Sequence, residues 1–280
     1  GNVGVTASLV DDYLTIDGRP LVGKELLDAK RVYPTELLPT VRDPRLSQTV
    51  ALPGQRMQPA GAGNPYVVGF PSLAGDGSAF GTNMTGYVML KHVQIDYTGD
   101  YISEYKGSTP AIQFRYADVL LNYAEALAEK NGAANAGKII EILHPLRERA
   151  GMPDIDFDRE YNTSAEYPFR NLDKYIQAVR RERRVEKALE GRRVFDIMRW
   201  AAAEELIIGN RAHGALFIGS NLPEQYGPEL KYDQASGNNM FLTGSPDDAE
   251  RYILPVPPST MPNLSLIHIS EPTRPEPISY

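Results

Sequence analysis

The sequence predicts a mainly α-helical fold with long irregular loops and minor β-structure. Two apolar stripes with helical spacing follow each other within residues 112–151, and a highly charged segment with a four-residue period follows at residues 180–200. The remaining chain holds most of the 24 glycines and 22 prolines, which mark turns and loops. We therefore expect a helical core at residues 111–205, between loop-rich segments at residues 1–110 and 206–263.

The first apolar stripe predicts a helix that ends near Gly132. Its large residues recur at three- and four-residue spacing, which places them on one helix face. Alanines between them keep that surface thin, so another helix can approach closely. Gly132, which follows Asn131, has the composition of a helix stop. The stripe consists of Ile112, Tyr116, Val119, Leu120, Tyr123 and Leu127, and the alanines are Ala117, Ala124, Ala126 and Ala128.

The second stripe predicts the other half of a helical hairpin. It consists of Ala136, Ile139, Ile140, Leu143 and Leu146. The pattern closes at Gly151, and Pro145 should bend or interrupt this helix. The hairpin has about the size of one tetratricopeptide unit, and no second copy occurs at a fixed period. Because such solenoids need roughly three units to be stable, the apolar stripe stays exposed unless other segments cover it.

The charged segment carries rows of like charge. Glu182, Glu186 and Glu190 stand four residues apart, an arrangement that costs a few tenths of a kcal/mol per pair on an isolated helix. The rows should therefore face partners elsewhere in the fold, and Arg147 and Arg149 are the natural candidates. Arg180 and Arg184 form a second row with the same spacing. We interpret these charges as scaffold and not as catalytic groups.

An apolar segment follows the charged rows. Gly191 should interrupt the helix, and a dense apolar cluster is expected just beyond it, made of Val194, Phe195, Ile197, Met198 and Trp200. Trp200, the single tryptophan, is predicted to pack in the core and not to serve as a stacking platform for a ligand. Elsewhere, short helices are expected at residues 9–14 and 21–27, and residues 87–97 could pair as a strand.

Composition excludes several classes of function. The net charge of −7 argues against nucleic-acid binding, which needs a basic face. The chain has no cysteine, which excludes disulfides, thiol catalysis and thiolate metal sites. The four histidines lack the spacing of metal ligands, and no glycine-rich stretch has the pattern of a phosphate loop. We expect neither a metal nor another cofactor.

Glycine-rich loops with aromatic residues are the candidate ligand-binding regions. Such loops are either irregular filler or binding surfaces. Aromatic rings could stack on the C–H faces of sugars, while amide and carboxylate side chains reach the hydroxyls. The candidates in residues 53–83 are Tyr66, Phe70 and Phe80, and those in residues 219–250 are Tyr226 and Tyr232.

Several motifs occur along the chain in a recognisable order. They are VRDPRL at residues 41–46, GYVMLKHV at 86–93, RYADVLLNYAEAL at 115–127, LRERAG at 146–151, ERRVEKALEGRRVFDIMRW at 182–200 and YILPVPPSTMPN at 252–263. In sequence and order, these motifs resemble the SusD/RagB family. One departure is His144, where the family pattern usually has asparagine. The resemblance implies a SusD-like fold in which the hairpin is of the tetratricopeptide type.

The resemblance also implies a function. Members of this family are non-catalytic, surface-exposed lipoproteins of the outer membrane that bind glycans for polysaccharide utilisation. They partner TonB-dependent transporters, to which they deliver oligosaccharides. A secretion signal, a lipid-anchored cysteine and most repeat helices are then expected to precede Gly1. Residues 264–280 are interpreted as an artefactual tail, because LSLIHISEPTR matches the translation of an adapter used in DNA library preparation.

Two other functions remain open from the residues alone. A glycoside hydrolase would need two carboxylates about 5–10 Å apart across a cleft. Nothing in the spacing singles out such a pair, although Asp96, Asp100 and Glu104, or Asp247 and Asp248, could be nominated. A repeat-type scaffold that binds other proteins in a concave groove is the second alternative.

Overall fold

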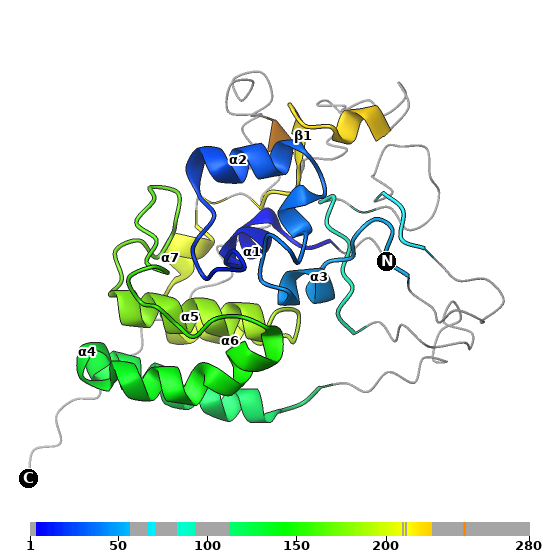
Figure 1. The fold of residues 1–280 in the computed structure, drawn as a ribbon. Coiled ribbons are helices and arrows are strands. Elements are labelled where there is room, and N and C mark those ends of the chain that lie inside the picture. The colour runs from blue at the N-terminus through cyan, green and yellow to red at the C-terminus, as the bar shows by residue number, and fades with distance from the viewer. Residues whose placement is uncertain are drawn as a thin grey trace, which may run out of the picture.

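The computed structural model describes residues 4–56, 67–70, 83, 85–92, 112–208, 210, 212–225 and 243–244. These residues form a mainly helical structure with little strand, as the sequence predicts. The α-helices are α1 (Ala7–Asp12), α2 (Gly23–Arg31), α3 (Arg45–Thr49), α4 (Tyr116–Ala150), α5 (Lys174–Glu186), α6 (Arg193–Arg199) and α7 (Ala203–Leu206). Figure 1 shows α4 and α5 side by side at one edge of the molecule, with the short N-terminal helices on the side of α5 away from α4.

The predicted hairpin is confirmed as the two arms of α4. Asn131 breaks the helix with an extended backbone (φ −174°, ψ 89°), and its side-chain oxygen accepts a hydrogen bond from the backbone N–H of Ala134 at 3.0 Å, so that it caps the second arm. Gly132 has a packing role, because a Cβ there would lie 2.4 Å from the Cβ of Tyr175 on α5. Gly151, with φ +72°, ends the helix.

Pro145 does not interrupt the second arm. The helix continues through this residue, and the only non-helical backbone within α4 is at Asn131. Proline removes one backbone donor and crowds the preceding turn. The expected interruption at Pro145 is therefore wrong.

The first arm of α4 buries its small face and exposes its large one. Ala117, Leu121, Ala124 and Ala128 are buried in the same apolar cluster as Ala178 and Val179 of α5. The narrow alanine surface allows the close approach that the sequence indicates. The predicted stripe lies largely outside, with Ile112, Tyr116, Val119 and Tyr123 exposed.

The second arm behaves differently. Ile139, Leu143 and Leu146 of the predicted stripe are buried in that cluster. The exposed large apolar residues of the hairpin are therefore confined to its first arm.

The prediction of an apolar cluster after Gly191 is wrong. Val194, Phe195 and Met198 are among the most exposed apolar residues of the described chain, and only Asp196 of α6 is buried. The reason is the ion pair between Asp196 and Arg183 of α5 at 2.7 Å, which turns the polar side of α6 inward. Gly191 does separate α5 from α6, with φ +71°.

Trp200 is partly buried beside a small apolar cluster, so the predicted core packing is confirmed in part. Its ring meets Phe169 edge-on at 6.0 Å between centroids, and its indole N–H donates to Glu125 at 2.5 Å. The guanidinium carbon of Arg180 lies 4.4 Å from the ring centroid. The ring is therefore occupied by protein groups.

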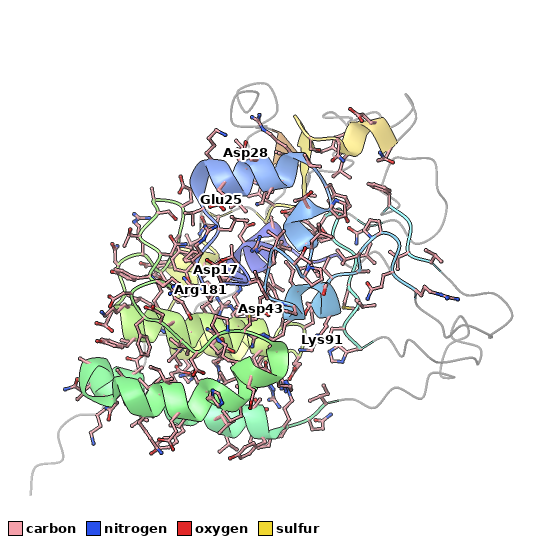
Figure 2. All side chains as sticks on the ribbon, in the orientation of Figure 1. Asp17, Glu25, Asp28, Asp43, Lys91 and Arg181 are labelled. Atoms are coloured by element: carbon pink, nitrogen blue, oxygen red, sulfur yellow. The ribbon has the colours of Figure 1, made fainter. Side chains whose placement is uncertain are left out.

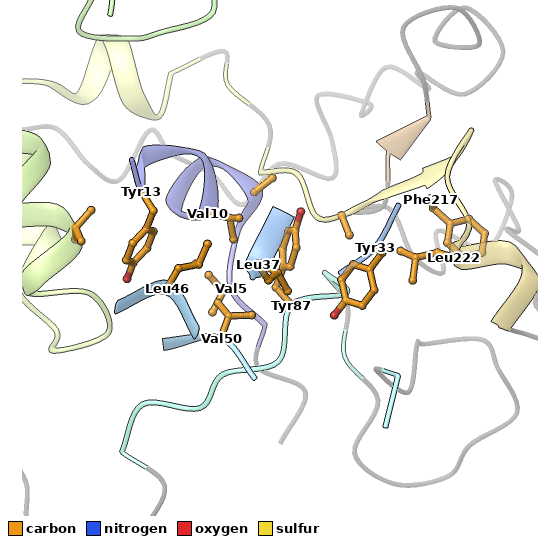
Figure 3. Close-up of a cluster of buried hydrophobic side chains, with 13 residues drawn as sticks. Val5, Val10, Tyr13, Tyr33, Leu37, Leu46, Val50, Tyr87, Phe217 and Leu222 are labelled. Carbon is orange, nitrogen blue, oxygen red and sulfur yellow. The ribbon is translucent and has the colours of Figure 1, made fainter. Parts of the chain in front are cut away.

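A second apolar core joins the two ends of the described chain. Val5 and Val10 of the N-terminal region meet Phe217 and Leu222 there, as Figure 3 shows. Phe217 belongs to β1 (Leu216–Ile218), which pairs in parallel with β2 (Thr243–Gly244). The 3₁₀ helices η1 (Thr35–Leu37) and η2 (Leu222–Gln225) complete the elements.

The expectations for the N-terminal half are met in part. The short helices are present as α1 and α2, with bounds shifted by a few residues. The expected strand at residues 87–97 is reduced, within its described part, to single bridges of Val88 with Gly4 and of Met89 with Val50. The remainder of that segment and the tail at residues 264–280 lie outside the described residues.

The predicted ion pairs between the charged helix and the end of α4 are confirmed. Arg147 pairs with Glu182 at 2.6 Å, and Arg149 pairs with Glu186 at 2.6 Å. Burial acts to raise the pKa of Glu182, but Arg147 and Arg45 outweigh it and lower the pKa to about 2. The rows of like charge are therefore stabilised by guanidinium groups.

Further cations that the sequence analysis missed complete this network. Arg45 of α3 bridges Glu182 at 2.6 Å and Glu186 at 3.0 Å, and it also pairs with Asp43. Arg115, Lys91 and Lys187 surround Glu190. Figure 2 labels Asp43 and Lys91, which reach this network from separate loops.

Candidate functional site

The sequence-predicted aromatic candidates fall mostly outside the described part of the chain. Phe70 is described, with 37% of its surface exposed, and its ring lies 5.8 Å from that of the buried Tyr33. Tyr66, Phe80, Tyr226 and Tyr232 lie outside the described residues, as do the carboxylates Asp96, Asp100, Glu104, Asp247 and Asp248. These residues stay predictions.

The described residues form an open cleft at the surface. Its cavity of about 420 Å³ lies between a turn that precedes α2 and the segment that links α4 to α5. This volume is within the usual range for small-molecule sites, about 300–1,000 Å³. We call it the Tyr161 cleft, and its lining consists of Arg19, Pro20, Val22, Arg159, Tyr161, Asn162, Thr163 and Ser164.

One wall of the Tyr161 cleft is an irregular segment that begins with a turn at residues 157–159. Arg159, Tyr161 and Thr163 are exposed, whereas Glu160 is buried. Glu160 pairs with the buried Arg147 at 3.1 Å. Burial raises the pKa of Glu160, and Arg147 offsets this only in part.

Gln177 of α5 holds the same wall in place. Its side chain is fully buried. The side-chain oxygen accepts from the backbone N–H of Asn162 at 2.7 Å, and the side-chain amide donates to the backbone oxygens of Asn162 at 2.9 Å and Phe169 at 3.1 Å. Helix α5 thus fixes the backbone of this wall. Ligand binding then costs less conformational entropy, because the wall is already ordered.

The opposite wall is a turn that is tied to the first one. Gly18 adopts φ +83°, and the hydroxyl of Thr15 donates to Asp17 at 2.5 Å, which lowers the pKa of Asp17. Arg159 donates from Nη1 to the backbone oxygen of Asp17 at 3.0 Å, across 142 positions in sequence. Arg19 forms a two-pronged ion pair with Glu25 of α2. Asp17 and Glu25 are labelled in Figure 2.

The chemistry of the cleft suits a polyhydroxylated ligand. Tyr161, with 38% of its surface exposed, offers a ring, and Thr163 supplies a hydroxyl. The Asn162 side-chain oxygen already accepts from the backbone N–H of Ser164 at 3.0 Å and from its hydroxyl at 2.8 Å, so Asn162 offers mainly its amide N–H groups. The sequence analysis missed these residues. The run Tyr161-Asn162-Thr163-Ser164, placed between two predicted helices, was the available signal.

A second cavity, of about 640 Å³, offers less to a ligand. Its lining consists of Asn122, Glu125, Ala126, Glu129, Arg180, Arg183, Arg199 and Trp200. These charges are largely paired with each other or with neighbours: Arg199 with Glu125 at 2.5 Å, and Arg180 with Glu129 at 3.1 Å. A ligand would have to displace those pairs.

Two absences concern the described residues alone. They contain no group of three histidine or acidic residues that could hold a metal ion. No described helix is both long and apolar enough to cross a membrane.

The fold places the chain in the class of mainly helical proteins built around a tetratricopeptide-like hairpin. The SusD family model matches residues 1–270, and the chain belongs to that family.

Individual relatives agree with this assignment. SusD-like protein P25 of Formosa agariphila is 32% identical over 110 residues, which are 39% of this chain and 18% of P25. A SusD-like protein of Bacteroides fragilis has a TM-score of 0.57 at 24% identity, covering 78% of this chain and 39% of its own. A SusD-like carbohydrate binding protein of the same organism has a TM-score of 0.54 at 27% identity, covering 91% and 46%. The chain spans less than half the length of each.

Proposed function

We propose that this chain is part of a non-catalytic glycan-binding protein. Membership of the SusD family supports the proposal, together with the similarity to a solved SusD-like carbohydrate binding protein. The observation in this chain that carries it is the Tyr161 cleft, in which an exposed ring stands beside amide and hydroxyl groups on a wall fixed by Gln177. Preformed sites of this kind bind with a smaller entropic cost.

We further propose that the whole protein is lipid-anchored at the outer-membrane surface and delivers oligosaccharide to a TonB-dependent transporter. This proposal rests on the family alone. Isolation of the full-length protein from its native membrane, followed by identification of co-purifying proteins, tests it. A transporter recovered in roughly equal amount supports the proposal, and a protein recovered without a transporter and without lipid contradicts it.

Binding to a panel of polysaccharides tests glycan recognition. We expect at least one glycan to bind, and Tyr161→Ala to weaken its binding by about tenfold, since stacking on one aromatic ring contributes about 1–3 kcal/mol in comparable recognition of flat groups. Tyr123→Ala is the matched control, because Tyr123 is also exposed but lies on α4, outside the cleft lining.

The outcomes separate the competing functions. Calorimetry that detects no glycan binding to the full-length protein contradicts the proposal. If Tyr161→Ala and Tyr123→Ala lose glycan affinity equally, the binding site does not lie in the Tyr161 cleft. Release of reducing sugar from a bound polysaccharide would favour the hydrolase alternative.

A further inference from the structure

We infer that the Tyr161 cleft recognises an acidic saccharide, and that Arg159 binds its carboxylate or sulfate group. This inference rests on the proposed function and narrows the class of ligand. The side chains that line the cleft include two arginines and no aspartate or glutamate.

The two arginines are not equivalent. Arg19 is already neutralised, because both of its terminal nitrogens donate to Glu25, at 2.7 and 2.6 Å, and its Nε lies 3.4 Å from Asp17. An anionic ligand would have to compete with these carboxylates for Arg19.

Arg159 is less tightly paired with carboxylates than Arg19 is. Its Nη1 donates to a neutral backbone oxygen, that of Asp17, and this bond orients the guanidinium without neutralising it. Its Nε forms a long ion pair with Asp156 at 3.7 Å, beyond hydrogen-bond distance, which balances the charge only in part. Within the described part of the chain, Nη2 has no hydrogen-bond partner, and the side chain is 51% exposed. A guanidinium held in this way presents the planar fork that fits carboxylate and sulfate oxygens.

The neighbouring groups would hold the sugar that carries the anion. Tyr161 and Thr163 line the same cleft as Arg159, and all three residues are exposed. An acidic group bound at Arg159 would therefore place its sugar ring beside the ring of Tyr161 and the hydroxyl of Thr163. Because the whole chain has a net charge of −7, selectivity for an anion has to come from this local guanidinium and not from the overall field.

Matched pairs of probes test the inference. The first pair is tetragalacturonate and its methyl ester, and the second is a sulfated galactan tetrasaccharide and its desulfated form. We expect one charged member to bind about 10- to 100-fold more tightly than its uncharged counterpart, the usual range for a charge-assisted hydrogen bond. The pair that shows the preference distinguishes carboxylate from sulfate.

Variants assign the preference to Arg159. Arg159→Gln should remove it, and Arg159→Lys, which keeps the charge without the fork, should retain part of it. Arg192→Gln is the matched control, because Arg192 also donates to a backbone oxygen, that of Gln113, but lies outside the cleft lining. Melting curves of the variants must match that of the parent protein; if Arg159→Gln fails to fold, Arg159→Lys decides.

Equal binding of charged and uncharged members overturns the inference, as does a preference that survives in Arg159→Gln. Binding of neither pair also overturns it. The proposed function is judged separately, because it stands if an uncharged glycan of the wider panel binds and fails if no glycan does.

Discussion

Replacing Glu182 with glutamine should lower the melting temperature by about 10 °C. Glu182 is buried between two guanidinium groups, with Arg147 at 2.6 Å and Arg45 at 2.6 Å. Glutamine has nearly the same shape, so the change removes the charge without opening a cavity. Its amide N–H groups would then face guanidinium donors.

The magnitude follows from the loss of the shared anion. Breaking a buried ion pair by removing one partner costs about 3–5 kcal/mol, because the other charge stays buried without compensation. Arg147 would keep Glu160, and Arg45 would keep Asp43 and Glu186, which places the loss at the lower end of that range. For a chain of this size, each kcal/mol shifts the melting temperature by roughly 2–4 °C.

The dependence on pH gives a second readout. The pKa of Glu182 is about 2 in the folded chain, against an ordinary value of 4.5. A lowered carboxylate pKa contributes stability that is fully present above about pH 4.5 and is lost as the pH falls toward 2. The stability difference between the parent protein and Glu182→Gln should therefore narrow across this window.

Thermal unfolding followed by circular dichroism measures both effects. Glu141→Gln is the matched control, because Glu141 pairs with Lys138 at an exposed position, and surface pairs contribute little. Its melting temperature should not differ measurably from that of the parent protein. If Glu182→Gln melts like the control at pH 7, the buried network does not stabilise the fold as argued.

Two further changes test other parts of the fold. Glu36 is fully buried, and burial raises its pKa to about 7, so the folded chain keeps this proton and loses stability as the pH rises from about 4.5 to 7. Glu36→Gln should therefore increase the free energy of unfolding at pH 8 by about 2–3 kcal/mol, measured by denaturant unfolding. Equal stability of the variant and the parent protein at pH 8 would contradict this. Gly132→Ala should destabilise the folded chain by about 1–3 kcal/mol, because the new Cβ would overlap Tyr175. An unchanged denaturation midpoint would show that α4 and α5 can shift apart to make room for the Cβ without loss of stability.

Local patterns predicted the hairpin and the ion pairs well. Helical spacing, Gly132 and Gly151 placed the two arms of α4 because these signals lie within a few residues of each other. Glu182 and Glu186 could be recognised as needing partners, because like charges at four-residue spacing are unfavourable on an isolated helix. The sequence named Arg147 and Arg149 correctly, and it missed Arg45, a contact that spans 137 positions.

Periodicity did not predict which face of a helix is covered. Tyr116 and Tyr123 form a clear apolar stripe, yet the alanine face of α4 is the one that meets α5. The same limit applies to α6, where Phe195 is exposed because Asp196 turns inward to Arg183. A stripe shows that a helix has two different faces, and only the neighbouring element decides which face is buried.

The sequence by itself determined the fold class, the family and the need for buried ion pairs, because each follows from residues that are close along the chain or in a recognisable order. Only the tertiary structure decided the Tyr161 cleft. Its walls are 142 positions apart at the hydrogen bond from Arg159 to Asp17, and Glu160, next to Tyr161, meets Arg147 in the interior. Such a site has no local pattern, since long-range contacts bring its groups together.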